Sequence, residues 1–271
     1  MNYLPSNVDR NVSSLEIARL VQGRGLAISK VFFTIQGEMP FAGRPAVFVR
    51  LAGCNRGAKI DCPFCDTEFS LNRAEIMSPA GLVDEIMSMT QDYNIDELLI
   101  VISGGEPTLQ IEGISSFVKC LEARIKPFET LIQFETNGDY LDKLAPFGDQ
   151  DEFEIVISPK ASPTAGHNES IGELLWGLPL NPYVRCVVSA DPEDPYHRLP
   201  DWVLRMEPCQ VFLSPITVYN QPVDHTKVVD FWGGDLIDRE RTGANYAHAR
   251  QLAMKHSFGL SMQTHLLFNL E

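Results

Sequence analysis

Short runs of apolar residues alternate along most of the chain with segments whose apolar residues recur at helical spacing. The runs predicted to be strands are Ile28–Phe33, Ala46–Leu51, Leu98–Ser103, Thr130–Glu135, Glu154–Ser158, Tyr183–Ser189 and Gln210–Ser214. Several of them are almost uninterrupted, which is typical of strands that are covered on both faces of a parallel sheet. The pattern predicts an α/β protein.

Helical spacing predicts helices from Ser78 to about Tyr93, over Ile111–Ile125 and over Ala244–His256. The first of these has Ser78 as a cap and a proline in its first turn. Repeated strand-then-helix units require right-handed crossovers, and they place ligands at the carboxyl ends of the strands. We expect residues 1–25 to precede the core as an extension and residues 26–271 to form one domain.

Polar and glycine residues gather where three of the predicted strands end. Ser103-Gly104-Gly105-Glu106-Pro107, Glu135-Thr136-Asn137-Gly138 and Ser158-Pro159-Lys160 follow consecutive strands. A glycine pair lets a ligand approach the backbone closely, although a simple turn is the better explanation of the pair when it is taken alone. The carboxyl edge of the sheet is therefore the expected place of a site.

Three of the six cysteines, Cys54, Cys62 and Cys65, lie within twelve residues. Three thiolates are one ligand short of a tetrahedral zinc site, and Asp61, Asp66 or a distant histidine could supply the fourth. Three thiolates also match a four-iron cluster in which one iron stays open to a ligand that is not protein. The cysteine spacing alone does not separate these two interpretations.

Composition and charge narrow the classes of function. With 271 residues, 44% of them apolar, the chain can bury a full core. It shows no signal peptide and no apolar run of 18 residues, so a cytoplasmic protein with reduced thiols and no membrane span is expected. Cys120, Cys186 and Cys209 lie in apolar contexts and are predicted to be buried packing residues.

The net charge of −14 argues against direct binding to nucleic acid. Basic residues nevertheless concentrate between residues 24 and 59, where the single acid is Glu38. This basic segment is either a solvated face or a site for an anionic ligand or an acidic partner. Its members are Arg24, Lys30, Arg44, Arg50, Arg56 and Lys59.

The Cys-Pro-Phe-Cys loop at 62–65, combined with Gly-Gly-Glu-Pro at 104–107, resembles the radical S-adenosylmethionine (SAM) superfamily. Within it, the chain resembles the 7-carboxy-7-deazaguanine synthase family through the Gln-Gly-Glu motif at 36–38, the segment 43–55 and Cys-Asp-Thr at 65–67. The motifs at 135–138, 158–160 and 263–265 are weaker matches. The chain departs from the common pattern in the seven residues between its first two cluster cysteines and in Ser103, where threonine is common.

The resemblance implies an incomplete, open TIM-like barrel of the radical SAM type, with the cluster loop at the carboxyl ends of the strands. It implies a carbon–nitrogen lyase that converts 6-carboxy-5,6,7,8-tetrahydropterin to 7-carboxy-7-deazaguanine with loss of ammonia, on the route to queuosine and other deazapurines. The reaction would use a 5′-deoxyadenosyl radical and regenerate SAM. A homodimer is implied, and a flavodoxin-type electron donor is expected. The basic segment from Arg24 to Lys59 could dock this donor, with Arg56 and Lys59 among the charges involved.

The same resemblance assigns site residues. Cys54, Cys62 and Cys65 would ligate a [4Fe–4S] cluster, and Thr67 would ligate Mg²⁺. The residues expected around SAM are Phe64, Gly105, Glu106, Ser158, Pro159 and Lys160. Those expected around the substrate are Ile35, Gln36, Gly37, Arg50, Ser103 and the terminal carboxylate of Glu271. Arg50 would bind the pterin carboxylate through two hydrogen bonds, although its chemistry fits a nearby Asp or Glu equally well.

Two other interpretations stay open. A radical SAM activating enzyme would form a glycyl radical on a partner protein and would need a groove for a polypeptide. A zinc-stabilised binding module would have no catalytic activity. Gln36, Gly37, Glu38 and Arg50 suggest a small carboxylated substrate and so favour the synthase.

Overall fold

The computed structural model describes residues 12–56, 62, 64, 65, 67, 69–124, 130–162, 166–220 and 236–264. Its helices are α1 (Ser14–Val21), α2 (Pro79–Thr90), α3 (Ile111–Glu122), α4 (Ser170–Gly177) and α5 (Arg239–His256). Its strands are β1 (Leu26–Ile35), β2 (Pro45–Leu51), β3 (Glu75–Met77), β4 (Leu98–Gly104), β5 (Thr130–Thr136), β6 (Phe153–Ile157), β7 (Ala161–Ser162), β8 (Gly166–His167), β9 (Tyr183–Val188), β10 (Val211–Pro215) and β11 (Gly259–Leu260). No helix in these ranges is long and apolar enough to cross a membrane.

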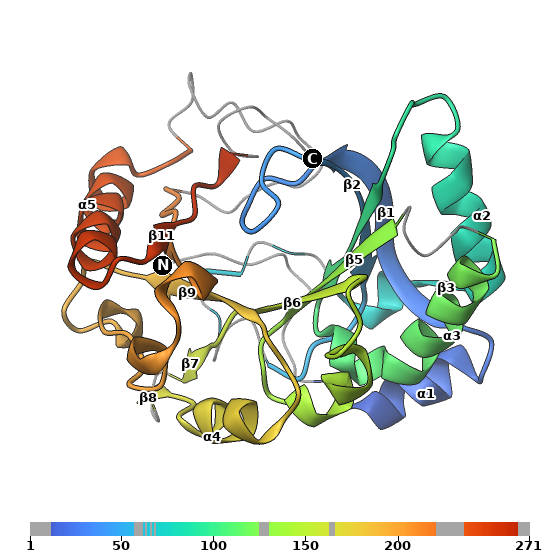
Figure 1. Ribbon diagram of the computed structural model, residues 1–271, viewed down its shortest axis with the longest axis horizontal. Helices are drawn as coiled ribbons and strands as arrows, with labels where there is room; N and C mark the ends of the chain where they lie inside the picture. Colours follow the sequence, from blue (N-terminus) through green and yellow to red (C-terminus); the bar gives the residue numbers. More distant parts are fainter. Residues whose placement is uncertain are drawn as a thin grey trace.

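Nine of these strands form one sheet in the order β11-β10-β9-β6-β5-β4-β2-β1-β3. Every pairing from β11 to β2 is parallel, whereas β1 pairs antiparallel with both β2 and β3. The sheet is curved, with α2, α3, α4 and α5 on its outer side (Figure 1). Its two edge strands, β3 and β11, do not pair with each other, so the prediction of an open, incomplete barrel is confirmed.

All seven predicted strands are present, and the three predicted helices correspond to α2, α3 and α5. Ser78 caps α2 as predicted, because its Oγ accepts a hydrogen bond from Gly81 N at 3.1 Å. The antiparallel pairing of β1 with β2 was not predicted. The connection from Ile35 to Pro45 is too short for a crossover helix, so the two strands form a hairpin.

The helix α1 was also not predicted. Its N-terminus carries a capping box, in which Ser13 Oγ accepts from Glu16 N at 3.3 Å and Glu16 Oε2 accepts from Ser13 N at 3.0 Å. Its buried Ile17 and Val21 pack in a small apolar cluster with Ala52 and Leu109. This helix therefore packs against the segments that follow β2 and β4.

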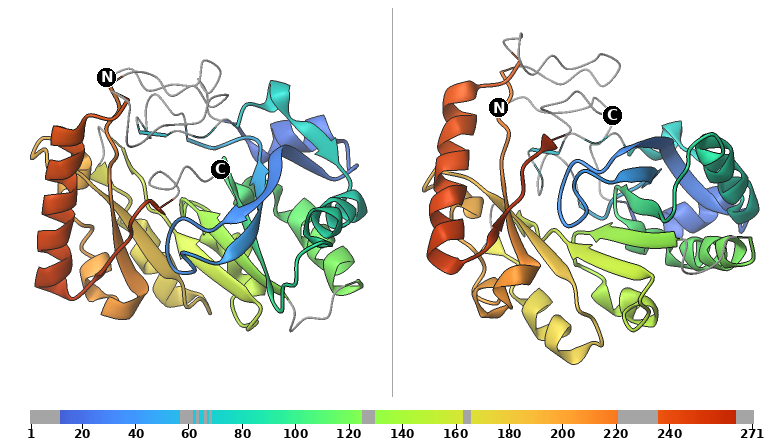
Figure 2. Two further views of the ribbon diagram at one scale, coloured as in Figure 1. Left: turned by 90° about the horizontal axis from the view of Figure 1, so that it is seen from above. Right: turned by 45° about the horizontal axis from the view of Figure 1, so that its top comes forward.

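The main core lies between the sheet and its outer helices, which appear around the strands in both views of Figure 2. Apolar residues of the central strands, among them Val49, Ile100 and Phe134, are at most 1% exposed. They pack with Leu82 of α2 and Phe117 of α3 in the same cluster. This packing fixes the positions at which the strands end.

The end of β4 approaches the end of β2 more closely than a side chain permits. Gly104 has φ +120°, and a Cβ there would lie 2.2 Å from Leu51 N. A Cβ at Gly105 would lie 1.9 Å from Gly53 O. Backbone hydrogen bonds span this contact, from Gly105 N to Leu51 O at 3.0 Å and from Glu106 N to Gly53 O at 2.9 Å. The sequence interpretation of an open, ligand-accessible glycine pair is thus incomplete, because the glycines also serve backbone packing.

We predict that Gly104→Ala destabilises the protein far more than Gly23→Ala. Gly23 also has a positive φ, +70°, but no atom lies within 4 Å of a Cβ built there. The left-handed conformation costs an alanine about 1–2 kcal/mol, and overpacking at residue 104 adds about 1–3 kcal/mol. Urea midpoints of the two variants measure the difference. Equal midpoints would show that the backbone at Leu51 moves to accommodate the added methyl group at little cost in stability.

Candidate active site

Four strand ends converge at one edge of the sheet. Leu51, the last residue of β2, pairs with Gly104 of β4, and Thr136 at the end of β5 pairs with Ile157 at the end of β6. Ser158 continues from β6 and donates its backbone N–H to Thr136 O at 2.7 Å. The motifs that follow β4, β5 and β6 are therefore neighbours in space, as the sequence predicted.

Glu106 lies at the centre of this edge and is fully buried. One carboxylate oxygen accepts from Thr108 N at 3.1 Å, Thr108 Oγ1 at 2.7 Å and Thr136 Oγ1 at 2.8 Å. The other accepts from Asn137 N at 2.8 Å. Burial raises the pKa of Glu106, and these hydrogen bonds oppose that effect. The carboxylate thus holds the ends of β4 and β5 together, while its expected contact with SAM stays a prediction.

The three clustered cysteines lie beside this centre. Cys54 is buried and follows Gly53, whose φ is +88°. Cys62 is also buried, and the backbone N–H of half-buried Cys65 donates to Cys62 O at 3.0 Å. Cys65 packs against Cys54 and Phe69 in one apolar cluster. Among the described residues, no three His, Cys, Asp or Glu side chains are already arranged as metal ligands.

The donor set nevertheless fits an iron–sulfur cluster. All three residues carry thiols, which are the soft ligands that such clusters use. Burial raises the pKa of the Cys54 thiol, and nearby Glu106, Cys62 and Cys65 add to the effect. A thiol in such a place is held as thiolate when a metal replaces its proton.

Residues of the cysteine loop contact the end of β6. Lys160 Nζ donates to Ser158 Oγ at 2.6 Å and lies 5.8 Å from the centre of the Phe64 ring. Desolvation lowers the pKa of Lys160, while the neighbouring cysteines act in the opposite direction. Phe64, Ser158 and Lys160 are thus brought together, and Pro159 between the last two is buried.

Tyr196 was not predicted, because it lies between the predicted strands Tyr183–Ser189 and Gln210–Ser214 and in no predicted helix. Its ring packs edge-on against Phe64, with centroids 5.1 Å apart. Its hydroxyl accepts from Ala161 N at 2.9 Å and donates to Ala161 O at 3.2 Å. Tyr196 therefore joins the cysteine loop to the segment that follows Lys160.

Arg56 does not lie on a solvated positive face, as the docking hypothesis required. Its side chain is 12% exposed and forms an ion pair with Asp139 at 2.6 Å. Its guanidinium also donates to Lys160 O at 3.2 Å. That part of the hypothesis is wrong, because the half-buried carboxylate of Asp139 binds the charge. Lys59, its proposed companion, lies outside the described residues.

Several residues expected around the substrate lie together with Glu135. Its carboxylate accepts from Gln36 Nε2 at 3.4 Å and from Ser103 Oγ at 3.1 Å. The C-terminal motif contacts Gly37. Thr264 N and Thr264 Oγ1 donate to Gly37 O at 3.1 Å and 2.8 Å. Segments from both ends of the chain therefore meet at this part of the site.

Arg50 pairs with Ser103 across β2 and β4, and its guanidinium lies 5.1 Å from the centre of the Phe32 ring. No carboxylate of the described residues forms an ion pair with it, so the alternative of an Asp or Glu partner is not observed there. Ile35 and Thr67 are half-buried. Glu271 lies outside the described residues.

Arg185 was missed because it alternates with apolar residues along β9. Its guanidinium forms an ion pair with Glu38 and lies 3.8 Å from Glu135 Oε2. All three side chains are no more than 15% exposed. One arginine therefore neutralises part of the charge of two carboxylates that face the same region.

Of the remaining cysteines, Cys186 is buried, Cys120 is half-buried and Cys209 is exposed. The prediction that Cys209 is a buried packing residue is wrong. It lies in the 3₁₀ turn η7 (Pro208–Gln210), which precedes β10, so the apolar strand begins only after it.

Comparisons with known proteins agree with this geometry. The model of the radical SAM superfamily matches residues 49–162. The chain is 29% identical over 255 residues to the 7-carboxy-7-deazaguanine synthase of Rickettsia prowazekii, covering 92% of this chain and 90% of that one. It is 41% identical over 140 residues to the enzyme of that name from Hyperthermus butylicus, about half of each chain (51% and 53%). Its fold is similar to that of QueE from Escherichia coli, with TM-score 0.55, 19% identity and coverage of 93% and 98%.

We predict that Tyr196→Phe destabilises the protein by about 1–3 kcal/mol, because it leaves both backbone polar groups of the buried Ala161 without the hydroxyl. Tyr93→Phe is the matched control, since Tyr93 is 59% exposed, and it should change stability by less than about 0.5 kcal/mol. Urea denaturation measures both. An equal effect of the two substitutions would contradict the role of the Tyr196 hydroxyl.

Proposed function

Because residues 49–162 match the radical SAM superfamily, we propose that the chain is a lyase that converts 6-carboxy-5,6,7,8-tetrahydropterin to 7-carboxy-7-deazaguanine with loss of ammonia. The observation that carries the proposal is a juxtaposition at one edge of the sheet. The cysteine loop and the glycine-rich end of β4 lie beside a polar cluster of Gln36, Ser103 and Glu135. Arg50 has no acidic partner in the described structure and lies on the neighbouring strand.

Cys54, Cys62 and Cys65 would hold the [4Fe–4S] cluster, with SAM on its open iron. When bound, these two groups supply the radical chemistry of the reaction. The half-buried backbone of Gly104 and Gly105 and the end of β6 at Ser158–Lys160 offer polar groups to SAM on the same edge. Phe64 is held beside Lys160 by Tyr196, where it can cover an adenine ring.

The substrate is recognised through its carboxylate and its ring. The planar guanidinium of Arg50 can donate two parallel hydrogen bonds to the carboxylate, which fixes orientation as well as position. Gln36, Gly37 and Ser103 border the ring, with Ile35 at the end of β1. Thr67 would ligate Mg²⁺, whose other ligands would come from the substrate and water, and the terminal carboxylate of Glu271 would complete the site.

The reaction also requires an electron donor, for which we propose a protein of the flavodoxin type. We also propose a cytoplasmic location, because the three thiols must stay reduced to bind iron. We propose a homodimer as the working assembly.

The activity is tested by reconstituting iron and sulfide without oxygen and adding SAM, a reductant and the carboxypterin. Mass spectrometry should detect 7-carboxy-7-deazaguanine and unconsumed SAM. Cleavage of SAM with no new deazapurine would reject this substrate while keeping the superfamily chemistry. A protein without iron that retains zinc would reject both.

We predict that Arg50→Lys and Arg50→Gln both lower kcat/KM for the carboxypterin, because neither can donate the fork of two hydrogen bonds. A lost charge-assisted bond is worth about 1.5–3 kcal/mol, which corresponds to a decrease of about 10–100-fold. Arg124→Gln is the control, since it removes an exposed ion pair between Arg124, which follows α3, and Asp84 of α2. Unchanged kinetics in both Arg50 variants would remove Arg50 from the site.

A further inference from the structure

We propose that Arg56 is a positioning residue for the iron–sulfur cluster. Its side chain is anchored on Asp139, and this anchor holds its backbone N–H against the sulfur of Cys54. The resulting hydrogen bond raises the reduction potential of the cluster. The inference rests on the proposed function, because it requires a cluster on Cys54, Cys62 and Cys65.

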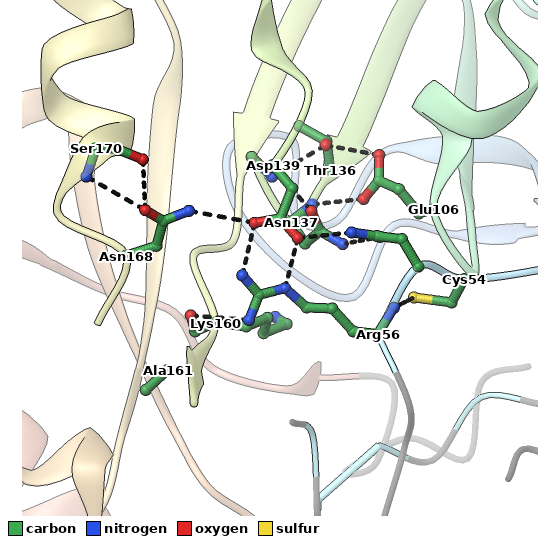
Figure 3. A network of polar contacts seen from close by, with 12 residues as sticks. Cys54, Arg56, Glu106, Thr136, Asn137, Asp139, Lys160, Ala161, Asn168 and Ser170 are labelled. Atoms are coloured by element: carbon green, nitrogen blue, oxygen red, sulfur yellow. Dashed lines mark hydrogen bonds and ion pairs between the residues drawn. The ribbon is translucent and has the colours of Figure 1, made fainter. Parts of the chain in front are cut away.

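The anchor is a bidentate ion pair (Figure 3). Arg56 Nε donates to Asp139 Oδ2 at 2.6 Å, and Arg56 Nη2 donates to Asp139 Oδ1 at 2.6 Å. The two side chains are 12% and 15% exposed. Two parallel hydrogen bonds fix the plane of the guanidinium as well as its distance, and the burial shields the pair from salt. The guanidinium is therefore a fixed point for the start of the cysteine loop.

Asp139 is itself held in place. It accepts further hydrogen bonds from Asn55 Nδ2 at 2.7 Å and Asn168 Nδ2 at 3.4 Å, and its backbone N–H donates to Asn137 Oδ1 at 2.9 Å. Burial alone would raise the pKa of Asp139, but the hydrogen bonds and charge of Arg56 lower it below its usual value. The anchor thus stays an ion pair, built on the end of β5.

The backbone of Arg56 contacts the sulfur of Cys54. Its backbone N–H donates to Cys54 Sγ, with N and S 3.4 Å apart. Hydrogen bonds to cluster sulfurs favour the reduced state, because that state carries more negative charge. The guanidinium also donates to Lys160 O at 3.2 Å, so the side chain also joins the loop to the segment that follows β6. Since Asp139 neutralises its charge, Arg56 acts through the position of its N–H.

The test is the midpoint potential of the anaerobically reconstituted protein, followed by electron paramagnetic resonance, with iron content measured in parallel. We expect both Arg56→Gln and Asp139→Asn to lower the potential, since each breaks the same anchor. The double variant should lie no lower than the single variants. A purely electrostatic effect predicts opposite shifts, because the first substitution removes a positive charge and the second a negative one.

Arg56→Lys keeps the charge but loses the bidentate geometry, so it should shift the potential in the same direction as Arg56→Gln. Arg124→Gln should leave it unchanged. A higher potential for Asp139→Asn, or unaltered potentials with full iron in all variants, would overturn the proposal. Iron loss from Arg56 or Asp139 variants that keep their circular dichroism spectrum supports the proposal. Global unfolding of Arg56→Gln, Arg56→Lys and Asp139→Asn would assign the ion pair to fold stability and overturn the proposal. A wild-type chain that takes up no iron would instead refute the proposed function.

Discussion

The backbones of β2 and β4 touch at the point where both strands end, and the rest of the site depends on this contact. Glycine is required at residues 104 and 105 because the neighbouring backbone occupies the space of a Cβ. The contact sets Gly53, and therefore Cys54, directly beside the start of the turn that carries Glu106. Glu106 then fixes Thr136 and Asn137 by hydrogen bonds, so that one close approach determines the relative positions of three strand ends.

Most of the charged side chains described at this edge form ion pairs. Asp139 is paired with Arg56, and Arg185 lies between Glu38 and Glu135. Leaving a buried charge without a partner is costly, so these pairs are expected in a site with so many carboxylates. Arg50 differs, because its described neighbours offer it the face of Phe32 rather than an anion. A cation of this kind suits a negatively charged ligand, which is the central physical argument for a carboxylated substrate.

The sequence predicted the strands well, because buried parallel strands have long apolar runs that few other elements share. It predicted the convergence of the motifs at 103–107, 135–138 and 158–160, since residues that follow neighbouring parallel strands meet at one edge. It did not reveal Tyr196 or Arg185, because a tyrosine in a loop and an arginine in an apolar strand have no distinctive local pattern. The pairing of Arg56 with Asp139 joins residues 83 positions apart, so Arg56 was taken for a surface charge. The exposed Cys209 shows the converse error, in which an apolar neighbourhood in sequence does not produce burial.

The proposed chemistry requires a metal cluster that three cysteines hold and that SAM completes. The most direct measurement is electron paramagnetic resonance of the reduced, anaerobically reconstituted protein, with and without SAM, on material whose metal content is known. We expect about four irons per chain and a spectrum that changes when SAM binds the open iron. Stoichiometric zinc without iron, or a cluster spectrum that SAM leaves unchanged, would contradict it.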